Sequence, residues 1–276
     1  MGCFISHRSE LEYLVGESLN YKPDVSNETT AIYISSDKIL WKVCTGEPAV
    51  IRQTFLNNYR VKRLTHSQWV VQPKQLFKLS ETKLAISMVC YSTDLFNFTR
   101  KPFNLNRVLD GMQDIAEAMA FLHSKGLAHR DIKPENIVIG PKYFRLIDFD
   151  FTSPLVTYAR CGTAYYICPR RICDEWKCST REYSVRCDMY AFGKTIISIF
   201  YYAALVNVVK HHEFIATVFK KQGVLEKIDN PFEGNQRKWF DIALQCCQKI
   251  PVLKAVTTTD QTANTLEMIY ADEVAT

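Results

Sequence analysis

The chain has 276 residues, of which 47% are hydrophobic and 23% are charged, as in an ordinary globular protein with a substantial core. Its net charge of +5 is scattered, and no segment shows the clustered lysine and arginine of a nucleic-acid surface, so no nucleic-acid partner is expected. The ten cysteines follow no disulfide spacing and include no Cys-x-x-Cys pair, which favours reduced thiols and a cytoplasmic location.

The chain opens with a sequence, Met-Gly-Cys-Phe-Ile-Ser, that fits the pattern for N-myristoylation. Loss of the first methionine would expose Gly2 for a myristoyl chain, and Cys3 beside it is a site for palmitate. Because one myristoyl chain binds membranes only marginally, the second lipid is what would make attachment to a membrane surface stable. The alternative is a chance Met-Gly start without lipid. Residues 1–29 otherwise lack periodicity and predict an N-terminal tail.

Residues 30–91 predict a small β-rich domain. One helix-like stretch, Phe55–Leu64, interrupts a series of short strand-like runs. The expected strands are Ala31–Ile34, Ile39–Val43, Ala49–Thr54, Leu76–Leu79 and Leu84–Val89.

Residues 92–276 predict a larger, mainly helical domain. After Asn104, apolar residues recur at helical spacing and predict one long amphipathic helix that ends near His123. Two strand-like runs follow it, at Ile137–Ile139 and Phe144–Leu146. A β-rich lobe before a helical lobe predicts an α+β fold with a cleft between the two lobes.

The most informative motif is His-Arg-Asp-Ile-Lys-Pro-Glu-Asn, at residues 129–136. It resembles, residue for residue, the catalytic loop of the eukaryotic-type serine/threonine protein kinase family. The resemblance implies the bilobal protein-kinase fold and transfer of the γ-phosphate of ATP, with Mg²⁺ as cofactor, to a serine or threonine of a protein substrate. It also implies that Asp131 orients the acceptor hydroxyl and takes its proton, while Lys133 stabilises the transferring phosphoryl group.

A second motif, Asp148-Phe149-Asp150, stands where the same family has Asp-Phe-Gly. By this resemblance Asn136 and Asp148 hold the Mg²⁺ that bridges the phosphates. Phe149 would pack against His129 in the hydrophobic column of the family. The aspartate at the third position replaces a glycine and adds negative charge near the metal.

Two further segments resemble this family downstream. Residues 162–170 are similar to the segment that closes the activation loop, where Thr163 would hydrogen-bond to Asp131 and Lys133. The sequence Asp-Met-Tyr-Ala-Phe-Gly, which begins at Asp188, is similar to the start of a buried helix whose aspartate holds the backbone of the catalytic loop.

The resemblance gives Arg130 the role of receptor for a phosphate on the activation loop. Four residues are candidate acceptors of that phosphate: Thr152, Ser153, Thr157 and Tyr158. The alternative is a short loop without this form of regulation.

The β-rich domain departs from the family. Its third strand is expected to end at Arg52, which would replace the phosphate-binding lysine, with Val50 beside the nucleotide. Asn57 replaces the glutamate that pairs with this lysine. Residues 34–43 take the place of the Gly-rich loop and contain no glycine. Lys38 within them either supplies the phosphate charge, as in with-no-lysine kinases, or is a solvated strand lysine.

The expected fifth strand and hinge align with the family without gaps. The alignment places Met88 at the gatekeeper position and Val89 to Tyr91 beside the adenine. The retained base, lysine and metal ligands favour an active kinase. The eroded nucleotide clamp leaves two alternatives, a pseudokinase that acts as a docking module and a membrane-tethered scaffold for kinase partners.

Overall fold

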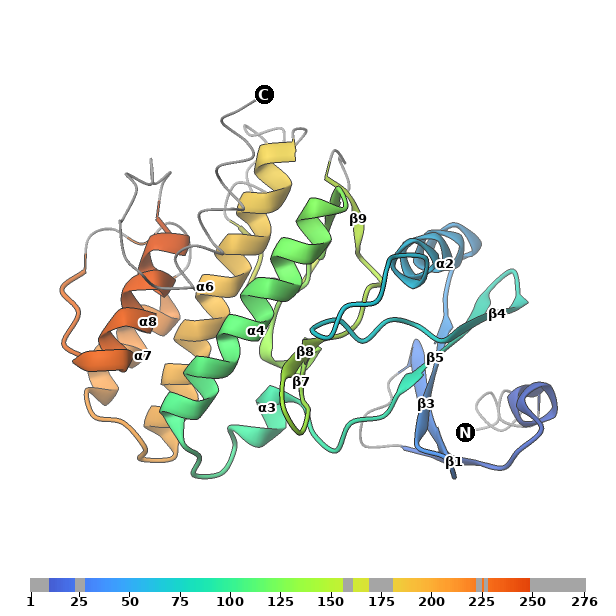
Figure 1. Ribbon diagram of the computed structural model, residues 1–276, viewed down its shortest axis with the longest axis horizontal. Helices are drawn as coiled ribbons and strands as arrows, with labels where there is room; N and C mark the ends of the chain where they lie inside the picture. The colour runs from blue at the N-terminus through green and yellow to red at the C-terminus, as the bar shows by residue number, and fades with distance from the viewer. Residues whose placement is uncertain are drawn as a thin grey trace. The chain divides into compact units, whose positions relative to one another are not determined.

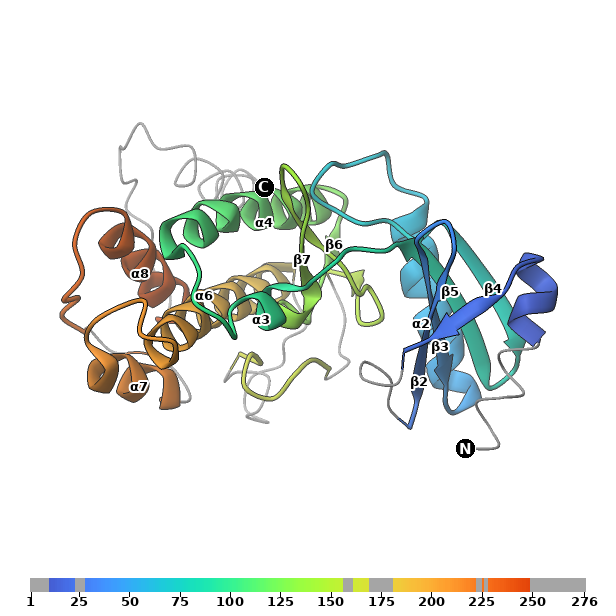
Figure 2. The same cartoon turned by 90° about the horizontal axis from the view of Figure 1, so that it is seen from below.

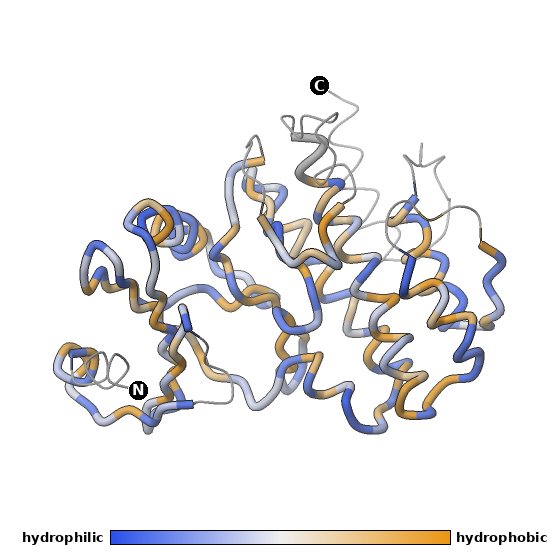
Figure 3. Tube along the Cα trace, turned by 180° about the vertical axis from the view of Figure 1, so that it is seen from behind, coloured by the Kyte–Doolittle hydropathy of each residue, from blue (hydrophilic) through white to orange (hydrophobic). Residues whose placement is uncertain are grey.

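The structure is a computed structural model that describes residues 10–22, 28–155, 161–168, 181–221, 225 and 228–248, without the side chains of 181–184. The chain divides into two compact units (Figure 1). Unit 1 comprises Met1–His66 and Val71–Tyr91, and unit 2 comprises Ser67–Val70 and Ser92–Thr276. Figure 3 shows hydrophobic and hydrophilic residues interleaved along the helices and strands of both units, as expected of amphipathic elements.

Unit 1 is built on a five-stranded antiparallel sheet in the order β1-β2-β3-β5-β4. The strands are β1 (Leu19–Tyr21), β2 (Thr30–Ser35), β3 (Ile39–Thr45), β4 (Gln75–Ser80) and β5 (Lys83–Val89). The β3–β5 pairing runs without a shift from Ile39 opposite Val89 to Thr45 opposite Lys83. Four of the five strands expected from the sequence are therefore present.

Residues 10–15 pack against one face of the sheet and residues 19–21 form its edge strand β1, although the sequence assigned both segments to a tail. Residues 10–15 are helical, and Leu11 and Leu19 are completely buried in a core cluster with Trp41 and Val43. The tail prediction is wrong for this segment. Two isolated leucines show no periodicity of their own, and their burial depends on a sheet formed by later residues.

The opposite face of the sheet is covered by α2 (Pro48–Lys62), as Figure 2 shows. The strand predicted over Ala49–Thr54 is therefore wrong. Pro48 fixes φ and lacks an N–H group, which suits the first turn of a helix and not a paired strand. The buried positions recur at helical spacing: Ile51, Thr54, Asn57, Asn58 and Val61.

Unit 2 is mainly helical. Its longer helices are α4 (Leu105–Ser124), α6 (Arg181–Leu205), α7 (His212–Lys220) and α8 (Gly234–Cys246), with the short α3 (Leu95–Phe98) before them. The predicted long helix is confirmed as α4, whose first turn is capped by the Asn104 side chain accepting from the Arg107 N–H at 3.1 Å. A Cβ atom on Gly193 of α6 would lie 2.7 Å from the Ala243 carbonyl oxygen, so glycine lets α6 and α8 pack closely.

Short strand pairs bring the sequence motifs of unit 2 together. The predicted hairpin is confirmed as β7 (Ile137–Ile139) paired with β8 (Phe144–Leu146). A second pair joins β6 (Leu127–Ala128) to β9 (Ser153–Pro154). The catalytic-loop motif therefore begins after β6, passes through the 3₁₀ turn η2 (Pro134–Asn136) and ends at β7.

Three further findings apply to the described ranges alone. Among the helices in these ranges, none has both the length and the apolar character needed to cross a membrane. The seven cysteines placed in them are thiols that form no disulfide. No group of three or more His, Cys, Asp or Glu side chains in the same ranges is arranged to hold a metal ion.

Candidate active site

The loop that carries Asp131 is tied to α6 by Asp188. The Asp188 carboxylate accepts hydrogen bonds from the backbone N–H groups of His129, at 2.8 Å, and Arg130, at 2.7 Å. It also lies 2.9 Å from Nε2 of His123. Burial opposes the charge of Asp188, but these hydrogen bonds and the nearby histidines outweigh it and lower the pKa of this carboxyl. The contact that the sequence predicted between Asp188 and the loop backbone is present.

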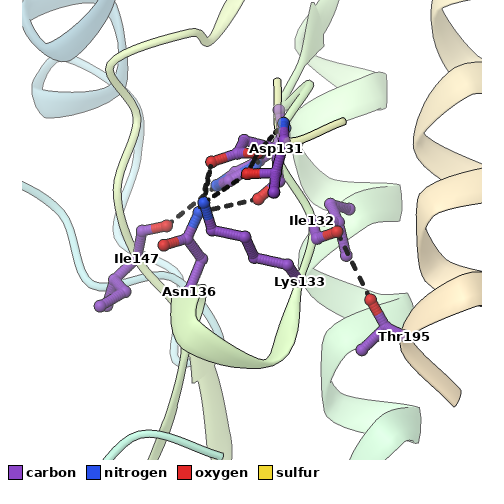
Figure 4. A network of polar contacts seen from close by, with 8 residues as sticks. Asp131, Ile132, Lys133, Asn136, Ile147 and Thr195 are labelled. Atoms are coloured by element: carbon purple, nitrogen blue, oxygen red, sulfur yellow. Dashed lines mark hydrogen bonds and ion pairs between the residues drawn. The ribbon is translucent and has the colours of Figure 1, made fainter. Parts of the chain in front are cut away.

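A second residue of α6, Thr195, supports the same loop and was missed in the sequence. Its Oγ1 lies 2.8 Å from the Ala191 carbonyl oxygen and 3.4 Å from that of Ile132 (Figure 4). Thr195 follows Asp188 by seven residues, which is about two helical turns, so both side chains lie on one side of α6. That spacing is the signal that could have identified it.

The buried carboxylate of Asp131 receives donors on both oxygens (Figure 4). Oδ1 accepts hydrogen bonds from the Thr163 N–H at 2.8 Å and the Thr163 hydroxyl at 2.7 Å. Oδ2 lies 2.8 Å from Nζ of Lys133 and accepts from Nδ2 of Asn136 at 3.0 Å. Because all these partners donate, they hold Asp131 as an acceptor with both oxygens fixed in place.

Lys133 and Thr163 form a directed hydrogen-bond chain to this carboxylate. Nζ of Lys133 donates to Oγ1 of Thr163 at 2.6 Å, and the same hydroxyl donates onward to Asp131. Gly162 has a φ of 111°, and a Cβ atom there would lie 2.6 Å from the Arg130 carbonyl oxygen. Glycine is therefore needed for this segment to approach the catalytic loop.

The two predicted metal ligands are placed near each other by Ile147. Its N–H donates to the Asn136 carbonyl oxygen at 2.9 Å, and its own carbonyl oxygen lies 3.0 Å from Nε2 of His129 (Figure 4). Asp148 follows directly, with a φ of 65°. Nδ2 of Asn136 donates hydrogen bonds to Asp131, so the amide oxygen of Asn136 points away from that residue. Amide and carboxylate oxygens are ligands that Mg²⁺ prefers, so this pair fits that metal.

Phe149 packs where the resemblance predicted. Its side chain is buried, and its ring meets that of His129 edge to face, with centroids 5.4 Å apart. The Thr152 N–H donates to the Phe149 carbonyl oxygen at 3.1 Å, which closes a turn after the motif.

Arg130 contacts a serine of the following segment. Its Nη1 donates to Oγ of Ser153 at 2.8 Å, and its backbone has a φ of 74°. Ser153 and Thr152, two of the predicted phosphate acceptors, are 5% and 0% exposed. In this conformation neither hydroxyl is open to a second kinase. The other two candidates, Thr157 and Tyr158, lie outside the described residues.

Two residues that the sequence assigned to the third strand lie on a helix instead. Arg52 and Val50 lie on α2, where Arg52 is exposed and Val50 is 58% exposed. Their placement on the third strand was wrong, and the basis for assigning them to the nucleotide is lost with it. The third strand of the sheet, which directly precedes the helix, is β3, and its lysine is Lys42. A helix-starting Pro48 soon after β3 is the sequence signal that could have shown this.

Lys42 lies on the side of the sheet that α2 covers. It follows Trp41, which faces the opposite core, and successive residues of a strand point to opposite faces. On α2, the buried Asn57 uses its Oδ1 to accept from Nε2 of Gln53 at 2.7 Å and Nη1 of Arg60 at 3.0 Å. The helix contains no Asp or Glu, so the glutamate partner is absent as the sequence indicated.

Lys38 lies in the turn between β2 and β3 and not within a strand. It is exposed, with a φ of 61°, and its carbonyl oxygen accepts from the Cys90 N–H at 3.0 Å. This location removes the support for Lys38 as a phosphate ligand, because its suggested role required a place on a strand. The segment expected to replace the Gly-rich loop instead covers this turn and most of β3.

The remaining predicted residues have simple placements. Met88, which is buried, and Val89 are the last two residues of β5, and Tyr91 is the last residue of unit 1. Gly2 and Cys3 lie outside the described residues.

Comparison with known proteins identifies the family of this chain. The family model described as "Protein kinase domain" matches residues 37–263. Over 153 residues the chain is 30% identical to inhibitor of nuclear factor kappa-B kinase subunit alpha from Xenopus tropicalis, covering 49% of this chain and 20% of that protein. Over 110 residues it is 34% identical to MAP kinase-interacting serine/threonine-protein kinase 2 from Xenopus laevis, covering 34% and 23%.

A third relative, cAMP-dependent protein kinase type 3 from Saccharomyces cerevisiae, is 37% identical over 86 residues, which cover 30% of this chain and 20% of that protein. The matches thus span about a fifth to a quarter of the length of these relatives. The family match covers most of the chain, and the five-stranded sheet with its helical second unit has the α+β architecture that the family implies. The chain belongs to the protein kinase family.

Proposed function

We propose that the chain is an active protein kinase that transfers the γ-phosphate of ATP to serine or threonine hydroxyls of a protein substrate. The observation that carries the proposal is the donor network around Asp131, in which Lys133, Asn136 and Thr163 fix both carboxylate oxygens. Phosphoryl transfer depends mainly on positioning and charge, and this network provides both for the acceptor side of the reaction.

The roles follow from the contacts. Asp131 accepts the proton of the incoming hydroxyl and orients it, since its oxygens are held by fixed donors. Lys133, 19% exposed at its side chain, is placed to neutralise charge on the phosphoryl group as it moves. The relatives named serine/threonine kinases support the choice of acceptor.

Asn136 and Asp148 are the residues that would hold Mg²⁺. When bound, the ion would neutralise charge on the phosphate oxygens. Support comes from the backbone contacts of Ile147, which hold the peptide before Asp148 against Asn136 and His129.

Lys42 is the proposed phosphate cation in unit 1. It occupies the strand before the helix, which is where the family has this lysine. Strand alternation after Trp41 turns it to the side that α2 covers. A compact ammonium can serve as a point charge for phosphate even without a paired glutamate.

The second candidate function is a pseudokinase that binds partners without efficient transfer. The observation that favours it is Asn57, a neutral residue whose carbonyl oxygen is already used by Gln53 and Arg60. A carboxylate at this position would fix the lysine in the family's usual way, and α2 offers none.

The test compares wild type with Asp131→Asn. We measure thermal stabilisation by ATP and Mg²⁺ together with radiolabel transfer to a generic protein substrate. An active kinase gives a stabilising shift in both proteins, because nucleotide binding stabilises the fold by mass action. Transfer should fall by about a hundredfold or more in the variant, which lacks the general base. Stabilisation without transfer in wild type would identify a pseudokinase instead.

A further inference from the structure

The starting observation is Lys194, a lysine without exposed surface in the middle of α6. Its Nζ donates to the carbonyl oxygens of Lys221, at 3.0 Å, and Phe219, at 3.3 Å, at the end of α7. It also lies 4.1 Å from the ring centroid of Tyr165. Burying an ammonium group is costly unless its partners compensate, and an apolar side chain would fill the same space without that cost.

Tyr165 converges on the same carbonyl group. Its hydroxyl donates to the Phe219 carbonyl oxygen at 2.7 Å, and its ring packs on the Phe219 ring with centroids 4.7 Å apart. The Phe219 ring in turn stacks on Tyr201 of α6, with centroids 3.9 Å apart. One oxygen at the end of α7 therefore receives both the phenol and the ammonium, while Lys194 also lies over the phenol ring.

This contact lies two residues from the active site along the chain. The N–H groups of Tyr166 and Ile167 donate to the Thr163 carbonyl oxygen at 2.8 Å and 3.1 Å, which makes residues 163–167 a closed turn. The Tyr166 hydroxyl lies 3.3 Å from Oγ of Ser198 on α6. At the start of the turn, Thr163 holds Asp131.

We propose that Lys194, Tyr165 and the Phe219 carbonyl form a clamp that fixes this turn and so positions Thr163 against Asp131. Lys194 is then a positioning residue for the acceptor side of the transfer. It acts through Tyr165 and touches neither substrate nor nucleotide. This role rests on the proposed kinase function. It gives a reason for the buried ammonium group of Lys194, at a position where an apolar side chain could pack as well.

The test uses Lys194→Met, which keeps the length of the side chain and removes its charge, with the exposed Lys210→Met as matched control. The clamp predicts that Lys194→Met lowers kcat for protein phosphorylation by about tenfold, because a small misplacement near the reacting groups has a large effect on rate. KM for ATP should not change. Tyr165→Phe, which removes only the shared hydroxyl, should act in the same direction, and the double variant should be no slower than Lys194→Met.

A purely structural role gives a different result. Lys194→Met would then melt at a lower temperature while keeping wild-type kcat well below that temperature, and this outcome would overturn the clamp. If Lys194→Met does not fold, Tyr165→Phe alone tests the clamp, because it keeps the ring that packs on Phe219 and removes only the hydroxyl. A wild-type kcat and KM for Tyr165→Phe would then reject the clamp.

A second measurement separates the clamp from the proposed function. Hydrogen exchange at the amides of Thr163, Tyr166 and Ile167 should be faster in Lys194→Met than in wild type or Lys210→Met. If wild type transfers no phosphate and these amides still exchange faster in the variant, the kinase function fails and the clamp stands. If wild type transfers phosphate and both rates and exchange are unchanged in the variant, the clamp fails alone.

Discussion

At the scale of single residues, the proposed chemistry depends on how one carboxylate is held. Asp131 meets donors from its own loop, through Lys133 and Asn136, and from a distant segment, through Thr163. These side chains come from motifs with fixed spacing, which is why the sequence could identify them. Lys42 was missed because the third strand was assigned to the segment that forms the start of α2, and the helix signal of Pro48 was not used.

Lys42→Met tests the corrected register. The change should lower kcat by about a hundredfold, since removing one charge that stabilises the transition state typically has that effect. The exposed Lys38→Met and Arg52→Met serve as controls and should retain wild-type rates of radiolabel transfer. A loss in Arg52→Met with none in Lys42→Met would restore the register first expected from the sequence.

The charge of Lys194 has a consequence for stability against pH. Burial lowers the pKa of Lys194 from 10.5 to about 8, while Cys247 acts in the opposite direction. Burial raises the pKa of the Cys247 thiol and of the Tyr165 phenol, so these two neighbours stay neutral from pH 8 to 10. In that range the unfolded chain keeps a proton that the folded chain has released, so folding becomes more favourable as pH rises.

Urea unfolding measures this effect as the difference between wild type and Lys194→Met. The wild type should gain on the order of 2 kcal/mol relative to the variant between pH 8 and pH 10. A difference that stays constant over this range would show that the ammonium titrates as it does in water.

At the scale of elements, hairpins and amphipathic helices could be predicted, and α4 and the β7–β8 pair are the clearest cases. The start of α2 was assigned to a strand because its Ala-Val-Ile sequence has the β-branched character of one, although Pro48 directly before it is a signal for the start of a helix. A different limit applies to residues 10–21, whose buried leucines contact strands formed later in the chain.

Leu11→Ala tests whether the N-terminal segment is part of the core of unit 1. Leu11 is completely buried, so the change should lower the free energy of unfolding by about 2–5 kcal/mol. Tyr13→Ala is the matched control, because Tyr13 is 87% exposed on the same helical turn and its loss should change stability by less than about 0.5 kcal/mol. If both variants of the full chain lower the free energy of unfolding by the same small amount, residues 10–15 are a tail and not part of the core.

At the scale of the whole molecule, the residues proposed for transfer divide between the two units. Lys42 and the predicted adenine-contacting strand belong to unit 1, and the base and metal residues belong to unit 2. The family is common to both, since the match covers residues 37–263. The N-terminal acylation pattern precedes this match and stays a prediction.

Gly2→Ala tests that pattern, because alanine cannot be myristoylated. Wild type expressed in eukaryotic cells should incorporate labelled myristate and sediment in part with membranes, while the variant should do neither. Cys3→Ser should keep the myristate label and reduce the membrane fraction, because one acyl chain binds only weakly. Equal labelling of wild type and Gly2→Ala would contradict acylation at this site.

The support of the catalytic loop by Asp188 and Thr195 links activity to the integrity of a single helix. Both side chains come from α6, which is buried along most of its described length, so we expect the loop to stay in place while that helix persists. Heat should then release the catalytic loop at the temperature where unit 2 melts and not before.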